Sequence, residues 1–183
     1  MKDYLKKLII TNIEKWNDND IYAISLFVND LCDNPCKPTV TLGYNTNTQV
    51  AKILKEASSE IEARWNYAFW IQNNFFCFGD GDTSEIVKKW LKENKFPYYD
   101  DDDSTWDTDE AYDEAEEITE AFISVLISIV KEIHEQKLLT IKYGKELPII
   151  IHELEYYDEI AEQNIEANRQ RLVKEFADFC YNS

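Results

Sequence analysis

Apolar residues recur every three or four positions along several stretches of the chain, as they do on the buried face of a helix. Thr46 with Gln49, and Asp107 with Glu110, also have the capping-box spacing that marks a helix start. The predicted helices are Asp3–Trp16, Thr46 to about Glu60, Thr83–Asn94, Thr108 to about Gln136, and Tyr156–Tyr181, the last as one long helix or two short ones.

Other stretches are rich in β-branched and aromatic residues, which favour strands. The predicted strands are Ile21–Val28, Thr39–Tyr44, one or two within Ile61–Phe78, and either a pair around Gly144 or a single strand over Pro148–His152. Helices outnumber strands, and the first two strands follow one another. The pattern therefore predicts an α+β fold with a small, mostly antiparallel sheet packed with several helices, the long ones in the C-terminal half.

Composition favours a single domain over residues 1–183. The chain is 44% hydrophobic, enough to bury one sizeable core, and four glycines and four prolines leave no flexible linker. The most apolar run, Ala121–Val130, has about half the ~20 residues that a membrane span needs, so it predicts a buried helix. No signal-peptide pattern precedes the four sparse cysteines. We expect a cytoplasmic protein with reduced thiols and no membrane partner.

Charge narrows the choice of partner. The formal net charge is -17, and 12 of the 36 acidic residues lie between Phe96 and Val130, where there is no Lys or Arg. A chain of this charge repels phosphate backbones and anionic lipid surfaces. Nucleic acid is therefore a poor partner, and a basic protein is a better one.

The acidic residues are interleaved with aromatic ones in a predicted loop over residues 96–108 and in the helix start that follows. Aromatic side chains anchor protein interfaces, and carboxylates steer and pair with basic partners. The partner-binding residues predicted here are Tyr98, Tyr99, Asp100, Asp101, Asp102, Asp103, Trp106, Asp107, Asp109, Tyr112 and Asp113. The alternative is a solvated loop that aids solubility, followed by acidic residues that complement the helix dipole.

No reaction motif stands out, and we expect neither a metal nor an organic cofactor. His134 and His152 lack the spacing that places two ligands on one helix face, and Cys32 with Cys36 lacks a second ligand pair. A calcium-loop template starting at Asp103 has Thr108 where glycine is needed. Phosphate-binding glycine loops and a G-x-S-x-G elbow are missing from the sequence.

Three segments carry a resemblance: DIYAISLFVND with PTVTLGYN, EARWNYAFW, and PIIIHELEYYDEIAEQNIEANRQRL. Together they resemble the uncharacterised bacterial domain of unknown function 4303 family, over nearly the whole chain. That family supplies no catalytic residues to carry over. The general character of the chain is also similar to that of immunity proteins, which neutralise interbacterial toxins, many of them basic nucleases.

The sequence thus leads to a non-enzymatic acidic protein, an immunity protein or antitoxin that occludes the active site of a basic toxin domain. Two alternatives stay open. One is a small carboxylate- or metal-dependent hydrolase that uses His152 and Glu153, which requires these groups to converge in a concave pocket. The other is a structural or scaffold protein, which requires an exposed apolar patch and self-association.

Overall fold

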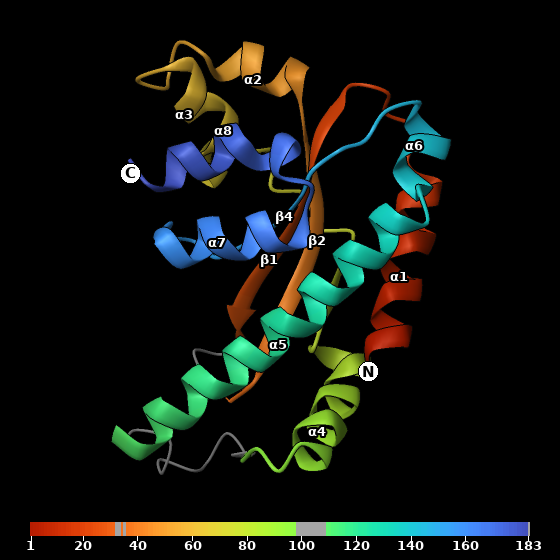
Figure 1. The fold of residues 1–183 in the computed structure, drawn as a ribbon, viewed down its shortest axis with the longest axis vertical. Helices are drawn as coiled ribbons and strands as arrows, with labels where there is room; N and C mark the ends of the chain where they lie inside the picture. Colours follow the sequence, from red (N-terminus) through yellow and green to blue (C-terminus); the bar gives the residue numbers. More distant parts are fainter. Residues whose placement is uncertain (32–33, 35, 98–108, 183) are drawn as a thin grey trace.

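The computed structural model describes residues 1–31, 34, 36–97 and 109–182, with only the backbone of residues 109–112. It confirms an α+β fold, in which helices cover both faces of a four-stranded sheet (Figure 1). The acidic loop predicted over residues 96–108 lies almost wholly outside the described residues.

The sheet is mixed but mostly antiparallel. Its strands are β1 (Ile21–Asp30), β2 (Pro38–Thr46), β3 (Phe76–Phe78) and β4 (Ile149–His152), in the order β3-β2-β1-β4. β1 runs antiparallel to β2 and parallel to β4, and β3 pairs antiparallel with β2. Leu26 stands opposite both Leu42 and Ile151, at the centre of the sheet.

One set of helices covers each face (Figure 1). The first consists of α1 (Lys2–Lys15), α4 (Ser84–Glu93), α5 (Asp109–Glu135) and α6 (Leu138–Tyr143), and the second of α2 (Asn47–Ile53), α3 (Glu60–Trp65), α7 (Asp158–Ala167) and α8 (Gln170–Cys180). Because successive side chains of a strand point to opposite faces of the sheet, each face has its own hydrophobic core beneath its set of helices. Ile149 and Ile151 point toward the first set, and Ile150 between them points toward the second.

The aromatic segment after α2 differs from its prediction. The second helix ends at Ile53 rather than near Glu60, and the helix α3 stands where a strand was expected. Ser59 caps α3 by accepting a hydrogen bond from the backbone N–H of Glu62. The indole N–H groups of Trp65 and Trp70 donate to the Glu175 carboxylate at 2.6 Å and to the Arg64 carbonyl at 2.8 Å. The aromatic residues therefore serve the packing between helices, and only β3 is a strand.

In the C-terminal third the sequence left two alternatives open, the number of strands before His152 and the number of helices after it. A single strand forms at Ile149–His152, and residues Leu138–Tyr143 form the helix α6, which ends at Gly144 in the left-handed conformation. The last segment forms two short helices, α7 and α8, because Asn168 adopts an extended backbone between them. The helices predicted at Asp3–Trp16, Thr83–Asn94 and Thr108 to about Gln136 are confirmed to within one or two residues.

Candidate functional site

The predicted partner-binding residues are only partly placed. Tyr98, Tyr99, Asp100, Asp101, Asp102, Asp103, Trp106 and Asp107 lie outside the described residues. Asp109 and Tyr112 belong to the first turn of α5, where only the backbone is described. Asp113 is exposed on α5. The next exposed residues of this helix lead into a groove that the sequence did not predict.

The groove lies between α5 and α7 and has a volume of about 690 Å³. Its floor is apolar, formed by Ile123 and Ile127 of α5, and Tyr157 lies beside it. Six carboxylates line it, and none of the described residues that line it is a Lys or Arg. These carboxylates belong to Glu116, Glu120, Glu153, Glu159, Glu162 and Glu166.

The helical repeat of α5 explains one wall. Ile118, Phe122 and Leu126 are fully buried against the sheet side of the helix. Ile123 and Ile127 lie one turn apart at the border of this buried face, and less than a tenth of the surface of each residue is exposed. Glu116 and Glu120 are also one turn apart and project outward.

The helix α7 forms the opposite wall, and it too has a buried face next to a row of exposed carboxylates. Ile160, Ala161 and Asn164 are buried beneath it. Glu159, Glu162 and Glu166 are exposed at intervals of three and four residues, which places them along one side of the helix.

The two helices converge at one end of the groove, as Figure 1 shows. There Lys131 pairs with Glu166 at 2.7 Å, and the His134 ring lies 3.0 Å from the Asn168 side-chain oxygen. These contacts close the groove at that end. Toward their N-termini the two helices diverge (Figure 1), and this is the open end of the groove. Among the lining carboxylates, Glu116, Glu120 and Glu159 belong to the N-terminal parts of these helices.

The loop between β4 and α7 forms the rim of this open end. A smaller hollow of about 320 Å³ shares Thr119, Glu153 and Tyr157 with the groove and continues it to Leu154 and Glu155. Leu154 is 73% exposed and Tyr157 is 42% exposed. Burial, together with the Glu153 and Glu159 carboxylates, raises the pKa of Tyr157, so its hydroxyl stays protonated.

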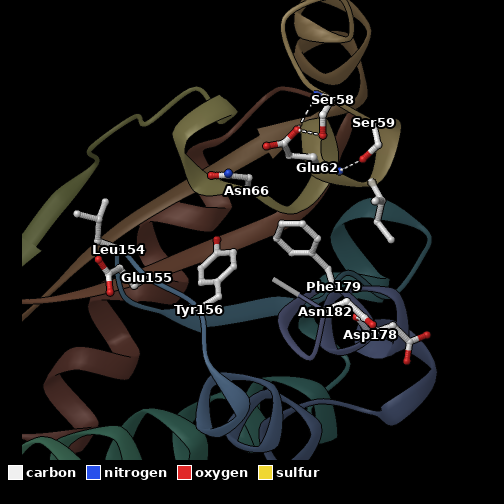
Figure 2. A pocket seen from close by; sticks show the side chains of 11 residues that line it. Ser58, Ser59, Glu62, Asn66, Leu154, Glu155, Tyr156, Asp178, Phe179 and Asn182 are labelled. Carbon is white, nitrogen blue, oxygen red and sulfur yellow. Dashed lines mark hydrogen bonds between the residues drawn. The ribbon is translucent and has the colours of Figure 1, made fainter.

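A second depression of about 740 Å³ lies on the other side of this loop, between α3 and the end of α8 (Figure 2). Tyr156 and Phe179 stand side by side within it, with ring centroids 5.9 Å apart. The Glu62 carboxylate at its edge accepts hydrogen bonds of 2.6 Å from the Ser58 amide and hydroxyl. Most polar groups here already serve the local fold, and the carboxylates are fewer than in the α5–α7 groove.

His152 lies apart from the groove, in the core. Its Nε2 atom is 2.8 Å from the Ser25 hydroxyl, and its Nδ1 atom is 2.9 Å from the Glu153 carbonyl. Four aromatic rings surround the imidazole, those of Phe27, Tyr67, Trp70 and Tyr156. Burial lowers the pKa of His152 to about 4, which keeps the ring neutral. The ring then accepts a hydrogen bond from Ser25 and donates one to Glu153.

A Ser–His pair is the arrangement of a nucleophile and its base, but this one is enclosed. His152 has no exposed surface, and Ser25 is 3% exposed. Glu153 is instead one of the residues that line the groove. The pocket that the hydrolase alternative requires, with His152 and Glu153 converging, is therefore not formed by these two residues.

The remaining candidates for chemistry are also placed in the core or dispersed. Within the described residues, no three His, Cys, Asp or Glu side chains form a group suited to a metal ion. Burial raises the pKa of Cys36 to about 11 and that of Cys180 to about 12, so both thiols are poor nucleophiles. Cys32 falls outside the described residues.

The groove was missed because its two walls are distant in sequence. Glu116 and Glu120 were included in the acidic cluster, but nothing in the sequence pairs them with Glu159 or Glu162 about 40 residues later. A usable signal did exist: carboxylates repeat at helical spacing on both segments, each beside an apolar row.

Comparisons with protein-family models, with curated proteins and with solved structures found no match to this chain. No helix in the described part of the chain has both the length and the apolar character needed to cross a membrane.

Proposed function

We propose that this protein is a non-enzymatic binding protein that holds a basic protein partner in the groove between α5 and α7. The observation that carries this proposal is the combination of an apolar floor with six lining carboxylates and no lining Lys or Arg among the described residues. Five of these carboxylates, on Glu116, Glu120, Glu159, Glu162 and Glu166, are exposed.

The two parts of the groove have different roles in binding. Exposed carboxylates raise the rate of encounter with a positively charged partner, and this effect weakens as salt is added. Once the partner is seated, burial of the exposed part of Tyr157 supplies most of the hydrophobic contribution, at roughly 25 cal/mol per Å² of apolar surface. Ile123 and Ile127 add little, because less than a tenth of each is exposed before binding. A nucleic acid is disfavoured, since its phosphates meet the same carboxylates.

An immunity protein or antitoxin is the class that fits this chemistry best. Such a protein would cover the cationic active site of a toxin domain, for example a nuclease, with its own carboxylates. The overall charge of -17 and the likeness to immunity proteins support this class. The product of the neighbouring gene is the natural first partner to test.

The test compares two variants of equal charge change. Glu116→Gln/Glu120→Gln/Glu162→Gln neutralises three of the six groove carboxylates, and Glu14→Gln/Glu56→Gln/Glu135→Gln neutralises three exposed carboxylates elsewhere. We expect the groove variant to slow association with the basic partner about tenfold at low salt, and the control to change it little. Association and dissociation rates measured at low and high salt check this. Equal rates for the groove variant and the unmodified protein would contradict the proposal.

A further inference from the structure

We infer that the groove receives an amphipathic basic helix of the partner, about three turns long and lying between α5 and α7. This inference rests on the function proposed above and names the structural element that is bound. Three features support it: the apolar and carboxylate groups that line the groove, the lack of free backbone hydrogen-bonding groups at the described edge of β4 beside it, and the length of the groove.

The strand β4 beside the groove lacks the free backbone N–H and C=O groups that an extended peptide would need in order to pair with it. An extended peptide binds by adding a strand to a sheet edge. The edge of β4 next to α7 is already occupied by side-chain amides. Asn164 accepts from the Ile151 N–H and donates to its carbonyl, at 2.9 and 2.6 Å. Asn168 makes the same pair of bonds with Ile149, both at 2.9 Å. A peptide therefore cannot add a strand at this edge without displacing these two side-chain amides.

Gln163 seals the same edge from within the groove. It is one of the lining residues, and its side-chain N–H donates to the Ile151 carbonyl at 2.9 Å. With this edge covered, an occupant meets apolar residues and carboxylates, with the neutral polar residues Thr119, Ser124 and Gln163 between them. A helix suits such a surface, because its own backbone hydrogen bonds are satisfied internally.

The dimensions set the length of the helix. Along α5 the groove runs from Glu116 to Ile127, which at 1.5 Å per residue is about 16 Å. A partner helix aligned with it contributes about 11 residues, or three turns, over that distance. Ile123 and Ile127 provide an apolar row one turn apart, which matches apolar residues at i and i+4 on the occupant.

The carboxylates of the groove determine which residues the partner helix needs on either side of its apolar stripe. Carboxylates lie on both walls, with Glu116 and Glu120 on α5 and with Glu159 and Glu162 on α7. The matching helix has an apolar stripe with Lys or Arg on both sides of it. Glu166 at the closed end is already paired with Lys131, so the basic residues belong over the open end and the middle.

The experiment uses two synthetic peptides of one composition. The first, about 14 residues long, places Leu on one helical face and Lys on both flanks, and the second has the same residues scrambled so that no apolar face forms. We expect the first to bind at least about tenfold more tightly and to gain helical circular dichroism on binding, because only it can place a row of Leu over Tyr157 and the exposed edges of Ile123 and Ile127. Fluorescence anisotropy measures the affinities.

Two protein variants locate the bound peptide. Ser124 is exposed and lines the groove, so Ser124→Arg adds bulk and positive charge there without altering the core. Gln136→Arg adds the same charge at an exposed position after the end of α5. The first should abolish peptide binding and the second should retain it.

The outcomes separate this inference from the proposed function. If both peptides bind equally and Ser124→Arg weakens both, the acidic groove stands as a binding site and the helical occupant is refuted. The same holds if neither peptide binds while the groove variant still slows association with a basic protein. If neither peptide binds and the groove variant has no effect on any basic partner, both proposals fall.

Discussion

At the scale of single residues, the enclosed imidazole of His152 links the stability of the fold to pH. Its pKa is about 4 in the folded protein, against an ordinary value of about 6.5. Between these values the unfolded chain binds a proton that the folded protein excludes. Stability contributed by the neutral ring is therefore complete above about pH 6.5 and is lost as the pH falls toward 4.

We predict that the free energy of unfolding falls by about 3 kcal/mol from this residue over that range, and that His152→Gln flattens the slope. Burial also lowers the pKa of His134, so part of the slope should remain in the variant. Urea denaturation at pH 7, 6 and 5 measures the slopes. Because the substitution also disturbs packing, the comparison is between slopes, and an unchanged slope would refute the assignment.

Residue identity alone could not assign these roles. Ser25 and His152 are 127 positions apart, and only the parallel pairing of β1 with β4 brings them within hydrogen-bond distance. Asn164 and Asn168 look like surface polar residues in a helix. Their burial follows from the position of α7 against β4, which no local pattern encodes.

At the scale of elements, sustained periodicity was the reliable signal. Both ends of the 27-residue helix α5 lie within a residue of their prediction, because a capping-box spacing marks its start and apolar positions recur along its length. Short elements were less predictable. In Ile61–Phe78 the density of aromatic residues favoured strands, whereas the cap at Ser59 and the indole hydrogen bonds of Trp65 and Trp70 favoured a helix followed by a turn. Tertiary packing outweighed local propensity there.

The join between α7 and β4 gives a prediction at this scale. Asn164→Leu leaves the buried N–H of Ile151 without its partner, while the Ile151 carbonyl keeps its bond from Gln163. We expect a loss of about 2 kcal/mol in the free energy of unfolding. Gln163→Leu is the matched control and should cost less than about 1 kcal/mol, since the same carbonyl keeps its bond from Asn164. Chemical denaturation measures both; equal losses would show that the Asn164 amide has no special role.

At the scale of the whole molecule, concentrated negative charge favours binding and opposes stability. Glu116 with Glu120, and Glu162 with Glu166, are like charges one helical turn apart, and such pairs destabilise a helix by roughly 0.2–0.5 kcal/mol each. The acidic composition was plain from the sequence, but the fold decides which carboxylates surround an apolar floor.

It follows that Glu116→Gln/Glu120→Gln/Glu162→Gln should raise the free energy of unfolding by about 0.5–1 kcal/mol at low salt while it weakens partner binding. Added salt screens exposed charges, so the gain should shrink as the ionic strength rises. Thermal unfolding across a salt series measures this. A variant that is less stable than the unmodified protein would show that these carboxylates have favourable contacts in the free state.

The amide-covered edge of β4 has a consequence beyond ligand binding. Unpaired strand edges are the usual templates for edge-to-edge aggregation. On this edge the backbone groups of Ile149 and Ile151 are taken by Asn164 and Asn168, and the opposite edge strand, β3, has only three residues. We therefore expect the edge of β4 to be a poor template for a strand of a second copy, even at high protein concentration.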